Sequence, residues 1–350
     1  MALRLLDVTA HPRSIHAMPD SAPRPRRPRV LVTRRLMPAV EARMAELFEV
    51  TLSADDIPMS PQKLEAALQN CDVLVPTLTD RIDARLIEAA GPDLKLIANY
   101  GNGIDHIDLK AARARGIVVT NTPGVFTEDT ADMTMALILS IPRRLVEGNK
   151  LVRSGAWTGW SPTHMLGHRV GGKLLGIIGL GRIGQAVARR ARAFGLSIHY
   201  HNRHRLPIGL EEQLGATWHA TPDTLLRIAD IVSIHCPHTD ETHEMIDEKR
   251  IASMKPTAYL INTARGEVCD EEALITALQH RRIAGAGLDV FSHEPAIDPR
   301  FLDLDNVVLL PHVGSATYEG REESGVRVVA NIRAWVDGHR PPDQILEGWA

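Results

Sequence analysis

The stretch KLLGIIGLGRIG (residues 173–184) decides the fold of this chain, because it joins a short apolar run to a glycine-rich turn. The apolar run predicts a buried strand, and the Ala- and Arg-rich residues that continue to Phe194 predict a helix. Gly179 permits the tight turn, Gly181 lets the backbone approach a pyrophosphate, and Gly184 lets the helix pack closely on the strand. We therefore predict a dinucleotide-binding site in which the phosphates lie at the N-terminus of the helix.

Similar apolar runs, each typical of a strand, occur on both sides of this turn. They are RVLVT (29–33), FEVTL (48–52), CDVLV (71–75), LKLIA (94–98) and GIVVT (116–120) before it, and LSIHY (196–200), DIVSIHC (230–236), AYLINTA (258–264), AGAGLDV (284–290) and NVVLL (306–310) after it. Amphipathic helical patterns separate most of them, and Ser60 and Pro61 are placed as the N-cap and first residue of one helix. Strands that alternate with helices predict parallel sheets covered by helices on both faces. The sequence thus predicts an α/β fold of two doubly wound parallel-sheet domains.

The first domain is expected to be discontinuous. The last amphipathic stretch, residues 318–338, follows no strand of its own and can return to the first sheet, so this domain takes residues 29–121 and 314–350. The second takes residues 122–313, which include a long helical pattern at 128–141.

The composition excludes several classes of protein. The 350 residues include 40 Lys and Arg against 43 Asp and Glu, and the net charge of −3 gives no field for binding nucleic acid. No apolar run approaches the ~18 residues needed to span a bilayer. Three distant cysteines, Cys71, Cys236 and Cys269, cannot build a disulfide framework or a four-thiolate zinc site. We expect a cytoplasmic protein with neither nucleic-acid nor membrane partners.

Residues 1–28 differ from the rest of the chain. They contain five arginines and a cluster of prolines, and they have no apolar segment like that of a signal peptide. We expect a disordered tail, in preference to an interaction arm.

The residues after the strand at 196–201 bear on the choice of cofactor. An NAD site is expected to carry an acid about 20 residues beyond the glycine turn, where it binds the ribose hydroxyls. Here the strand runs into HNRHR (201–205), and the next acid is Glu211. Arg203 and Arg205 could pair with a 2′-phosphate, which an acid would repel, so these residues favour NADP over NAD. The alternative is that both arginines are solvated surface charges.

Three side chains that follow strands of the second domain predict a substrate site. Arg265 follows AYLINTA, Glu294 follows AGAGLDVF, and His312 follows NVVLL, so all three are expected at the carboxyl ends of parallel strands. An arginine can bind the carboxylate and carbonyl of a 2-oxo acid, and a histidine paired with a carboxylate can give that carbonyl a proton as hydride arrives. Any one of them alone could be a surface ion pair or a loop cap. Together with the glycine turn, they predict hydroxyacid dehydrogenation.

The motifs taken together resemble those of the D-isomer-specific 2-hydroxyacid dehydrogenases, and most closely the glyoxylate/hydroxypyruvate reductases. They are GNGID (101–105), NTPGV (121–125), GLGRIG (179–184), TARG (263–266), GLDVF (287–291) followed by Glu294-Pro295, and PHVGS (311–315). The resemblance extends from about Arg29 to Gly338. It implies a Rossmann-type nucleotide domain, a flavodoxin-like substrate domain and a homodimer formed through the long helix.

The resemblance also implies roles for individual residues. It makes Arg265 the substrate-binding and carbonyl-polarising group, His312 the acid/base, and Glu294 the carboxylate that keeps His312 protonated and oriented. Backbone N–H groups of Asn102 and Gly103 are implied to bind the substrate carboxylate. Asp289 is implied to contact the nicotinamide carboxamide, and Trp160 to reach the substrate pocket of the partner subunit.

Cofactor contacts are expected from the glycine turn and from loops at neighbouring strand ends. The residues are Gly179, Gly181, Arg182, Ile183, Gly184, Asn202, Arg203, Cys236, Pro237, Thr242, Thr263, Ala264 and Asp289. Position alone favours core packing for Trp157, Trp160 and Met165. The 16 histidines suggest a metal, but no four-ligand set with supporting partners is evident, and we expect none.

The leading hypothesis is reduction of glyoxylate, hydroxypyruvate or a similar small 2-oxo acid to the D-2-hydroxy acid, with NADPH preferred and NAD possible. A dinucleotide-sensing interaction protein remains the alternative, because transcriptional corepressors resemble the same family and the tail is basic. A metal-dependent hydrolase is disfavoured by the glycine turn and the lack of clustered carboxylates.

Overall fold

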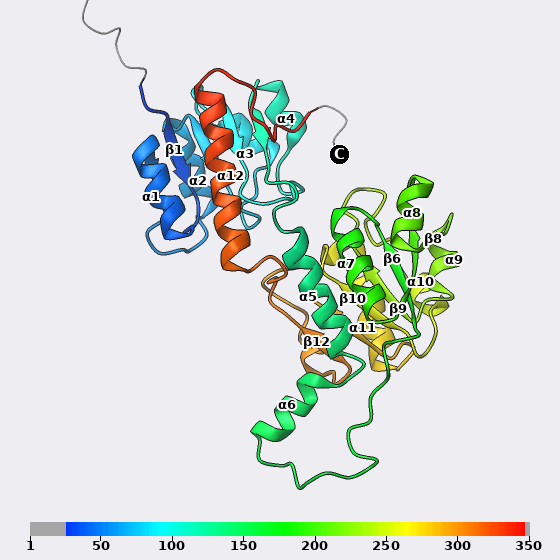
Figure 1. The fold of residues 1–350 in the computed structure, drawn as a ribbon. Helices are drawn as coiled ribbons and strands as arrows, with labels where there is room; N and C mark the ends of the chain where they lie inside the picture. The colour runs from blue at the N-terminus through cyan, green and yellow to red at the C-terminus, as the bar shows by residue number, and fades with distance from the viewer. Residues whose placement is uncertain (1–25, 347–350) are drawn as a thin grey trace, which may run out of the picture.

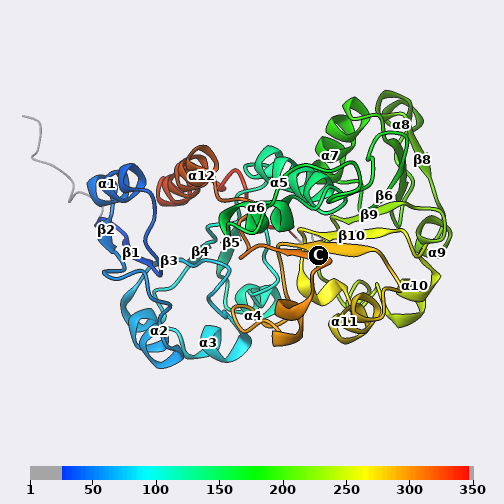
Figure 2. The same cartoon turned by 90° about the horizontal axis from the view of Figure 1, so that it is seen from below.

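The computed structural model describes residues 26–346, which form two units, each built on one sheet (Figures 1 and 2). The first sheet has the strand order β2-β1-β3-β4-β5, and the second has the order β12-β11-β10-β9-β6-β7-β8. All strand pairs of both sheets are parallel. The first order is flavodoxin-like and the second is an extended Rossmann order, which confirms the predicted fold class. The expected tail lies, except for residues 26–28, outside the described residues.

The first unit follows the predicted alternation of strands and helices. Its elements are β1 (Arg29–Val32), α1 (Pro38–Leu47), β2 (Glu49–Thr51), α2 (Pro61–Ala67), β3 (Val73–Val75), α3 (Ala84–Ala89), β4 (Leu96–Ala98), α4 (Leu109–Ala114), β5 (Val118–Thr120) and α12 (Tyr318–Val336). Side-chain oxygens of Ser60, Asp83 and Asp108 accept backbone N–H groups at the starts of α2, α3 and α4. These local hydrogen bonds explain where the helices begin.

Helix α12 returns to the first sheet, as its amphipathic pattern predicts. Val328 and Ile332 of α12 are fully buried in one cluster with Val32 and Val73 of the sheet. Figure 2 shows α1 and α12 on one face of this sheet and α2, α3 and α4 on the other. A side chain at Gly325 of α12 would overlap Val40 of α1, so the two helices approach closely.

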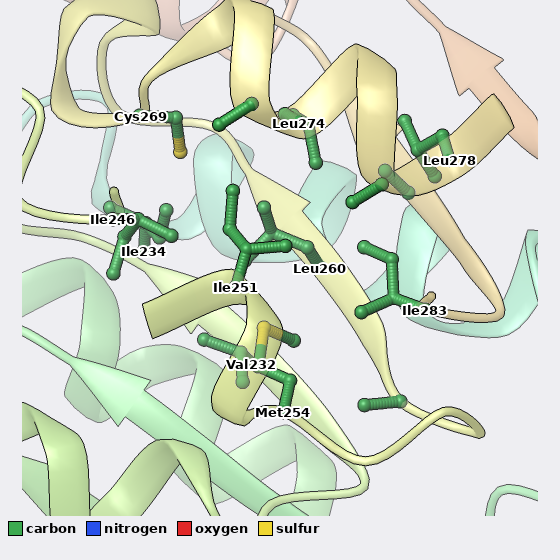
Figure 3. Close-up of a cluster of buried hydrophobic side chains, with 14 of the residues drawn as sticks. Val232, Ile234, Ile246, Ile251, Met254, Leu260, Cys269, Leu274, Leu278 and Ile283 are labelled. Carbon is green, nitrogen blue, oxygen red and sulfur yellow. The ribbon is translucent and has the colours of Figure 1, made fainter. Parts of the chain in front are cut away.

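The second unit places helices on both faces of its sheet. Its elements are α5 (Thr127–Ser140), α6 (Leu145–Arg153), β6 (Leu174–Ile178), α7 (Arg182–Ala193), β7 (Ser197–His201), α8 (Ile208–Leu214), β8 (Ala216–Trp218), α9 (Pro222–Leu226), β9 (Ile231–Ile234), α10 (Glu248–Ser253), β10 (Tyr259–Asn262), α11 (Glu271–Gln279), β11 (Gly285–Leu288) and β12 (Val307–Leu309). Figure 2 shows α5, α7 and α8 on one face and α9, α10 and α11 on the other. In Figure 3, Leu274 and Leu278 of α11 point toward Leu260 of β10, and together they bury a continuous apolar core.

Two elements, β8 and α6, were not predicted from the sequence, and one prediction of burial was wrong. The edge strand β8 has only three residues, too few for a period-2 pattern to be visible. Helix α6 buries none of its residues, and Figure 1 shows it and the following connection extending away from the two units. The prediction that the tryptophans of this connection pack in the core was wrong, because Trp157 is 53% exposed and Trp160 is 82% exposed. In residues 26–346, no helix is both long and apolar enough to cross a membrane.

Candidate active site

The glycine turn lies where the strand order of the second sheet reverses, between β6 and β9. Gly179 has a φ of 93°, and a Cβ there would lie 2.6 Å from the backbone nitrogen of Cys236. A Cβ at Gly184 would lie 2.5 Å from the Gly179 carbonyl oxygen, too close for any side chain, whereas one at Gly181 would meet nothing within 4 Å. Gly179 and Gly184 therefore allow tight packing, and Gly181 leaves open space at the start of α7. The first N–H groups of α7 face this space and fit the phosphates of a dinucleotide.

The loops around this turn are held by the residues predicted to contact a cofactor. Asn202 Oδ1 accepts the Leu180 N–H at 2.6 Å, so its carbonyl oxygen holds the glycine turn. Thr242 Oγ1 donates to the Pro237 carbonyl at 2.7 Å and accepts the Thr239 N–H at 2.8 Å, which closes the loop after β9. Burial raises the pKa of the Cys236 thiol to about 11, so Cys236 is protonated at neutral pH and suits a pocket wall better than a nucleophile.

The two arginines after β7 have different environments. Arg205 donates from Nη2 to Glu211 Oε2 at 2.7 Å, and its guanidinium carbon lies 5.8 Å from the Trp218 ring. The sequence expectation that Arg205 pairs with a phosphate is therefore corrected: this arginine is bound to the buried Glu211. Arg203 is exposed and forms no ion pair within residues 26–346. Its charge makes the smallest contribution to the lowered pKa of Glu241, after the Thr239 hydroxyl and the backbone of Glu241 itself.

His312 and Glu294 are brought together, as the sequence predicts. His312 Nδ1 lies 2.7 Å from Glu294 Oε2, and Glu294 Oε1 accepts the Phe291 N–H at 3.0 Å. Burial alone would raise the pKa of Glu294, but the hydrogen bond and charge of His312, with the Phe291 amide, hold it below its ordinary value. Glu294 is thus a carboxylate at neutral pH, and it can accept a hydrogen bond from His312 Nδ1.

Asp289 supports the backbone that carries His312. Its Oδ1 accepts the Val313 N–H at 2.8 Å and its Oδ2 accepts the Gly314 N–H at 2.7 Å. His312 has a left-handed φ of 53°, which costs energy for a residue with a side chain and needs such support. Burial raises the pKa of Asp289, and the two amides offset this only in part. In the structure both carboxylate oxygens of Asp289 hold the histidine loop, a role that the sequence expectation did not include.

The loop that carries Arg265 packs against the loop that carries Glu294. A Cβ at Gly266 would overlap the backbone of Phe291 and Ser292, so only glycine allows this approach. Thr263 is tied to α5 through a 2.9 Å hydrogen bond between its hydroxyl and that of Thr134. Ala264 donates its N–H to Asn262 Oδ1 at 3.0 Å. The positions of Arg265 and Glu294 are therefore coupled through packed backbone.

Arg265 also reaches the first unit. Its Nη2 lies 3.0 Å from Asp105 Oδ1, and a Cβ at Gly103 would overlap that same Nη2. Asn102 accepts Asn121 Nδ2 at its carbonyl at 2.8 Å. Among residues 26–346, the N–H groups of Asn102 and Gly103 donate to no protein acceptor, and Gly103 adjoins the guanidinium. No role was expected for Asp105 from the sequence, although Asp105 lies two residues beyond Gly103 in the GNGID motif (101–105).

The comparisons with known proteins agree with this arrangement. Residues 135–314 match the family described as D-isomer specific 2-hydroxyacid dehydrogenase, NAD binding domain. A glyoxylate reductase from Thermococcus litoralis is 47% identical over 326 residues, which cover 91% of this chain and 97% of that protein. The chain belongs to the D-isomer specific 2-hydroxyacid dehydrogenase family. It is accordingly an NAD(P)-dependent dehydrogenase, and the resemblance predicted from its motifs is confirmed.

Solved structures of this dehydrogenase family share the whole fold. A putative D-isomer specific 2-hydroxyacid dehydrogenase from Polaromonas has a TM-score of 0.86 at 43% identity and covers 91% of this chain and 99% of its own. An NADPH-dependent glyoxylate/hydroxypyruvate reductase from Sinorhizobium meliloti, solved with NADP and malonate, has a TM-score of 0.82 at 38% identity. It covers 92% of this chain and 97% of its own.

One predicted site residue of this dehydrogenase is not brought to the crevice of its own chain. Trp160 lies in the connection that extends away from both units, between α6 and β6 (Figure 1). Four of the histidines form two pairs: His199 Nδ1 lies 2.9 Å from His219 Nε2, and His238 Nε2 lies 3.2 Å from His243 Nδ1. Within the described part of the chain, no three His, Cys, Asp or Glu side chains are placed to share a metal ion.

Proposed function

We propose that this dehydrogenase reduces glyoxylate, hydroxypyruvate or a similar small 2-oxo acid to the D-2-hydroxy acid, with NADPH preferred over NADH. The observation that carries the proposal is the 2.7 Å contact between His312 Nδ1 and Glu294 Oε2, on a loop packed against the one that carries Arg265. The glyoxylate reductases among its relatives support the substrate class. We further propose that residues 29–121 and 314–350 act as the substrate domain and residues 122–313 as the dinucleotide domain.

Each of the three residues has a chemical task in this proposal. A bound reduced nicotinamide dinucleotide supplies the hydride for the carbonyl carbon. Arg265 binds the carboxylate and the carbonyl oxygen, and the N–H groups of Asn102 and Gly103 bind the carboxylate from the other side. His312 gives its Nε2 proton to the carbonyl oxygen, because Glu294 holds Nδ1. The C=O double bond becomes a C–O single bond, and new C–H and O–H bonds complete the hydroxy acid.

The preference for NADPH is proposed to rest on Arg203. It is exposed just beyond β7, and residues 201–205 include no carboxylate to bind the two ribose hydroxyls of NAD. Arg205 is not given this role, because its Nε and Nη2 already donate to Glu211. A 2′-phosphate carries close to two negative charges and gains a charge-assisted contact with Arg203 that a ribose hydroxyl lacks.

A homodimer is proposed from the exposed apolar arm, defined as residues 145–166. Leu145, Val152 and Leu166 of this arm are 54%, 61% and 66% exposed. Several exposed large apolar side chains on one segment are typical of an interaction site, and the partner we propose is a second copy of the chain. Trp160 of the arm, 82% exposed, is proposed to enter the substrate crevice of that copy.

Mixing two variants tests both the dimer and the shared site. Trp160→Ala subunits keep His312 and His312→Ala subunits keep Trp160, so a mixed dimer regains one complete site. Activity above that of either variant is expected after mixing. Additive activity with monomeric sedimentation would contradict the proposal.

The reaction itself is tested by the loss of reduced-cofactor absorbance. Turnover is expected with NADPH and glyoxylate or hydroxypyruvate, and it should be strongly reduced in His312→Ala. The alternative, a corepressor-like sensor, predicts NADPH binding without turnover. Binding without turnover for every small 2-oxo acid would contradict the proposed function.

A further inference from the structure

The ion pair between Asp105 and Arg265 links the two units of the molecule. Of the ion pairs recorded for residues 26–346, it alone joins the unit of the first sheet to the unit of the second. The two residues are 160 positions apart in the chain. We propose that Asp105 is a positioning residue, which orients the Arg265 guanidinium so that its terminal edge faces the substrate. This inference rests on the proposed substrate-binding role of Arg265.

The hydrogen bonds of the guanidinium show which of its edges remains available. An arginine side chain has five N–H donors: one on Nε and two on each Nη. Asp105 Oδ2 accepts from Nε at 3.1 Å and Oδ1 accepts from Nη2 at 3.0 Å. The Ala264 carbonyl accepts from Nη1 at 2.7 Å. One N–H on Nη1 and one on Nη2 are left, and this pair fits two oxygens of a 2-oxo acid. Asp105 therefore occupies the side edge of the guanidinium and leaves the fork for substrate.

Asp105 is itself ionised and held in place. Burial raises its pKa, but the charge and hydrogen bonds of Arg265 outweigh burial and keep the pKa below its ordinary value. Asn99 Nδ2 donates to the carbonyls of Gly101 and Gly103 at 3.0 and 2.8 Å, which fixes the loop that leads to Asp105. Burial lowers the pKa of His106, so its ring is neutral at neutral pH. The ring donates from Nε2 to Asn99 Oδ1 at 3.1 Å.

The pair also spans the crevice between the two units. The Arg265 guanidinium is fixed on one side by its own Ala264 carbonyl and on the other by Asp105 of the first unit. Without Asp105, the long side chain keeps its charge but regains rotational freedom, and it must lose this freedom again when substrate binds. The loss should appear in substrate binding and turnover, and cofactor binding should be unchanged.

The test uses Asp105→Asn, which keeps the size of the side chain but removes its charge and one acceptor. We expect kcat/KM for glyoxylate to fall about ten- to a hundredfold, the range for loss of a charge-assisted hydrogen bond. Oxamate, a carboxylate analogue that cannot be reduced, should inhibit the variant at least about tenfold more weakly. The affinity for NADPH should change less than about twofold, as expected for a residue that does not touch the cofactor.

A matched control is Asp108→Asn, which removes one negative charge three residues further on. Asp108 Oδ1 accepts the Ala111 N–H at 2.8 Å as the N-cap of α4, and asparagine is an equally good cap. This variant should match the wild type in every assay. Asp105→Glu, which restores the charge one methylene further out, should regain part of the loss and keeps the test valid if Asp105→Asn folds poorly.

A double-mutant comparison separates this inference from the proposed function. If Asp105 acts through Arg265, adding Asp105→Asn to Arg265→Lys should cost less than about twofold, because lysine has no side edge to hold. A full additional loss in that background, or a single Asp105→Asn variant that behaves like Asp108→Asn, would overturn the inference alone. An Arg265→Lys variant with wild-type kinetics and oxamate inhibition would instead overturn the role proposed for Arg265, and the inference with it.

Discussion

Glu294→Gln is the sharpest test of the proton-transfer assignment. In the structure each oxygen of Glu294 has its own donor: Oε2 faces His312 Nδ1 at 2.7 Å and Oε1 accepts the Phe291 N–H at 3.0 Å. Glutamine has a single acceptor oxygen and no charge, so it cannot serve both donors as well as the carboxylate does. The substitution therefore removes the anion that holds the His312 ring through Nδ1.

The size of the effect follows from the contact. A hydrogen bond to a charged group is worth about 1.5–3 kcal/mol, and both side chains are mostly shielded from solvent. A tenfold change in rate corresponds to about 1.4 kcal/mol, so loss of the carboxylate is expected to lower kcat/KM for glyoxylate about ten- to a hundredfold.

The assay is kcat/KM for glyoxylate with NADPH at neutral pH. Glu271→Gln is the matched control, because Glu271 Oε2 accepts the neighbouring Ser292 N–H at 2.9 Å without touching His312. It removes the same charge from the first residue of α11, which holds the same loop, and should leave kcat/KM in place. A Glu294→Gln variant whose kcat/KM falls no further than that of the control would refute the proton-transfer role.

Three further predictions concern the other site residues. His312→Ala should lower kcat by roughly 10²- to 10⁴-fold with little change in NADPH affinity, measured by steady-state kinetics and cofactor titration. The kcat/KM of the wild-type enzyme with NADPH should be at least about tenfold higher than with NADH. Arg203→Ala should lower this ratio by raising the KM for NADPH, whereas Arg205→Ala should keep the ratio and lower the unfolding temperature. Gly103→Ala should raise the KM for glyoxylate and lower kcat, because its methyl group would displace Arg265 Nη2, while the KM for NADPH stays unchanged.

The sequence predicts the parts of this site that depend on local pattern. The turn at 179–184 needs glycine for reasons confined to a few neighbouring residues, and strand ends place Arg265, Glu294 and His312 at one edge of a parallel sheet. The close contact of His312 and Glu294 follows from that topology without knowledge of any other side chain.

The sequence does not predict which partners the long side chains contact. Arg203 and Arg205 look equivalent in HNRHR, yet only Arg205 finds a carboxylate, because α8 brings Glu211 beside the end of β7. Asp105 lies in the GNGID motif (101–105), but its ion-pair partner, Arg265, lies in the other unit. Trp157 and Trp160 are exposed although core packing was expected for them. Composition does not show that the segment that carries them extends away from both units of its own chain.

The coupling of the two units explains why the site needs residues from both sheets. Arg265 lies on the unit that binds the dinucleotide, and the backbone that adjoins it, at Gly103, lies on the other. In the proposed complex, a 2-oxo acid between them contacts the guanidinium fork and the N–H groups of Asn102 and Gly103 only when the two units are as close as the Asp105 contact holds them. Substrate affinity should therefore report on this distance, whereas NADPH affinity, which we propose depends on the glycine turn and Arg203, should not. The prediction that Asp105→Asn changes oxamate inhibition but not NADPH binding is the direct consequence of this separation.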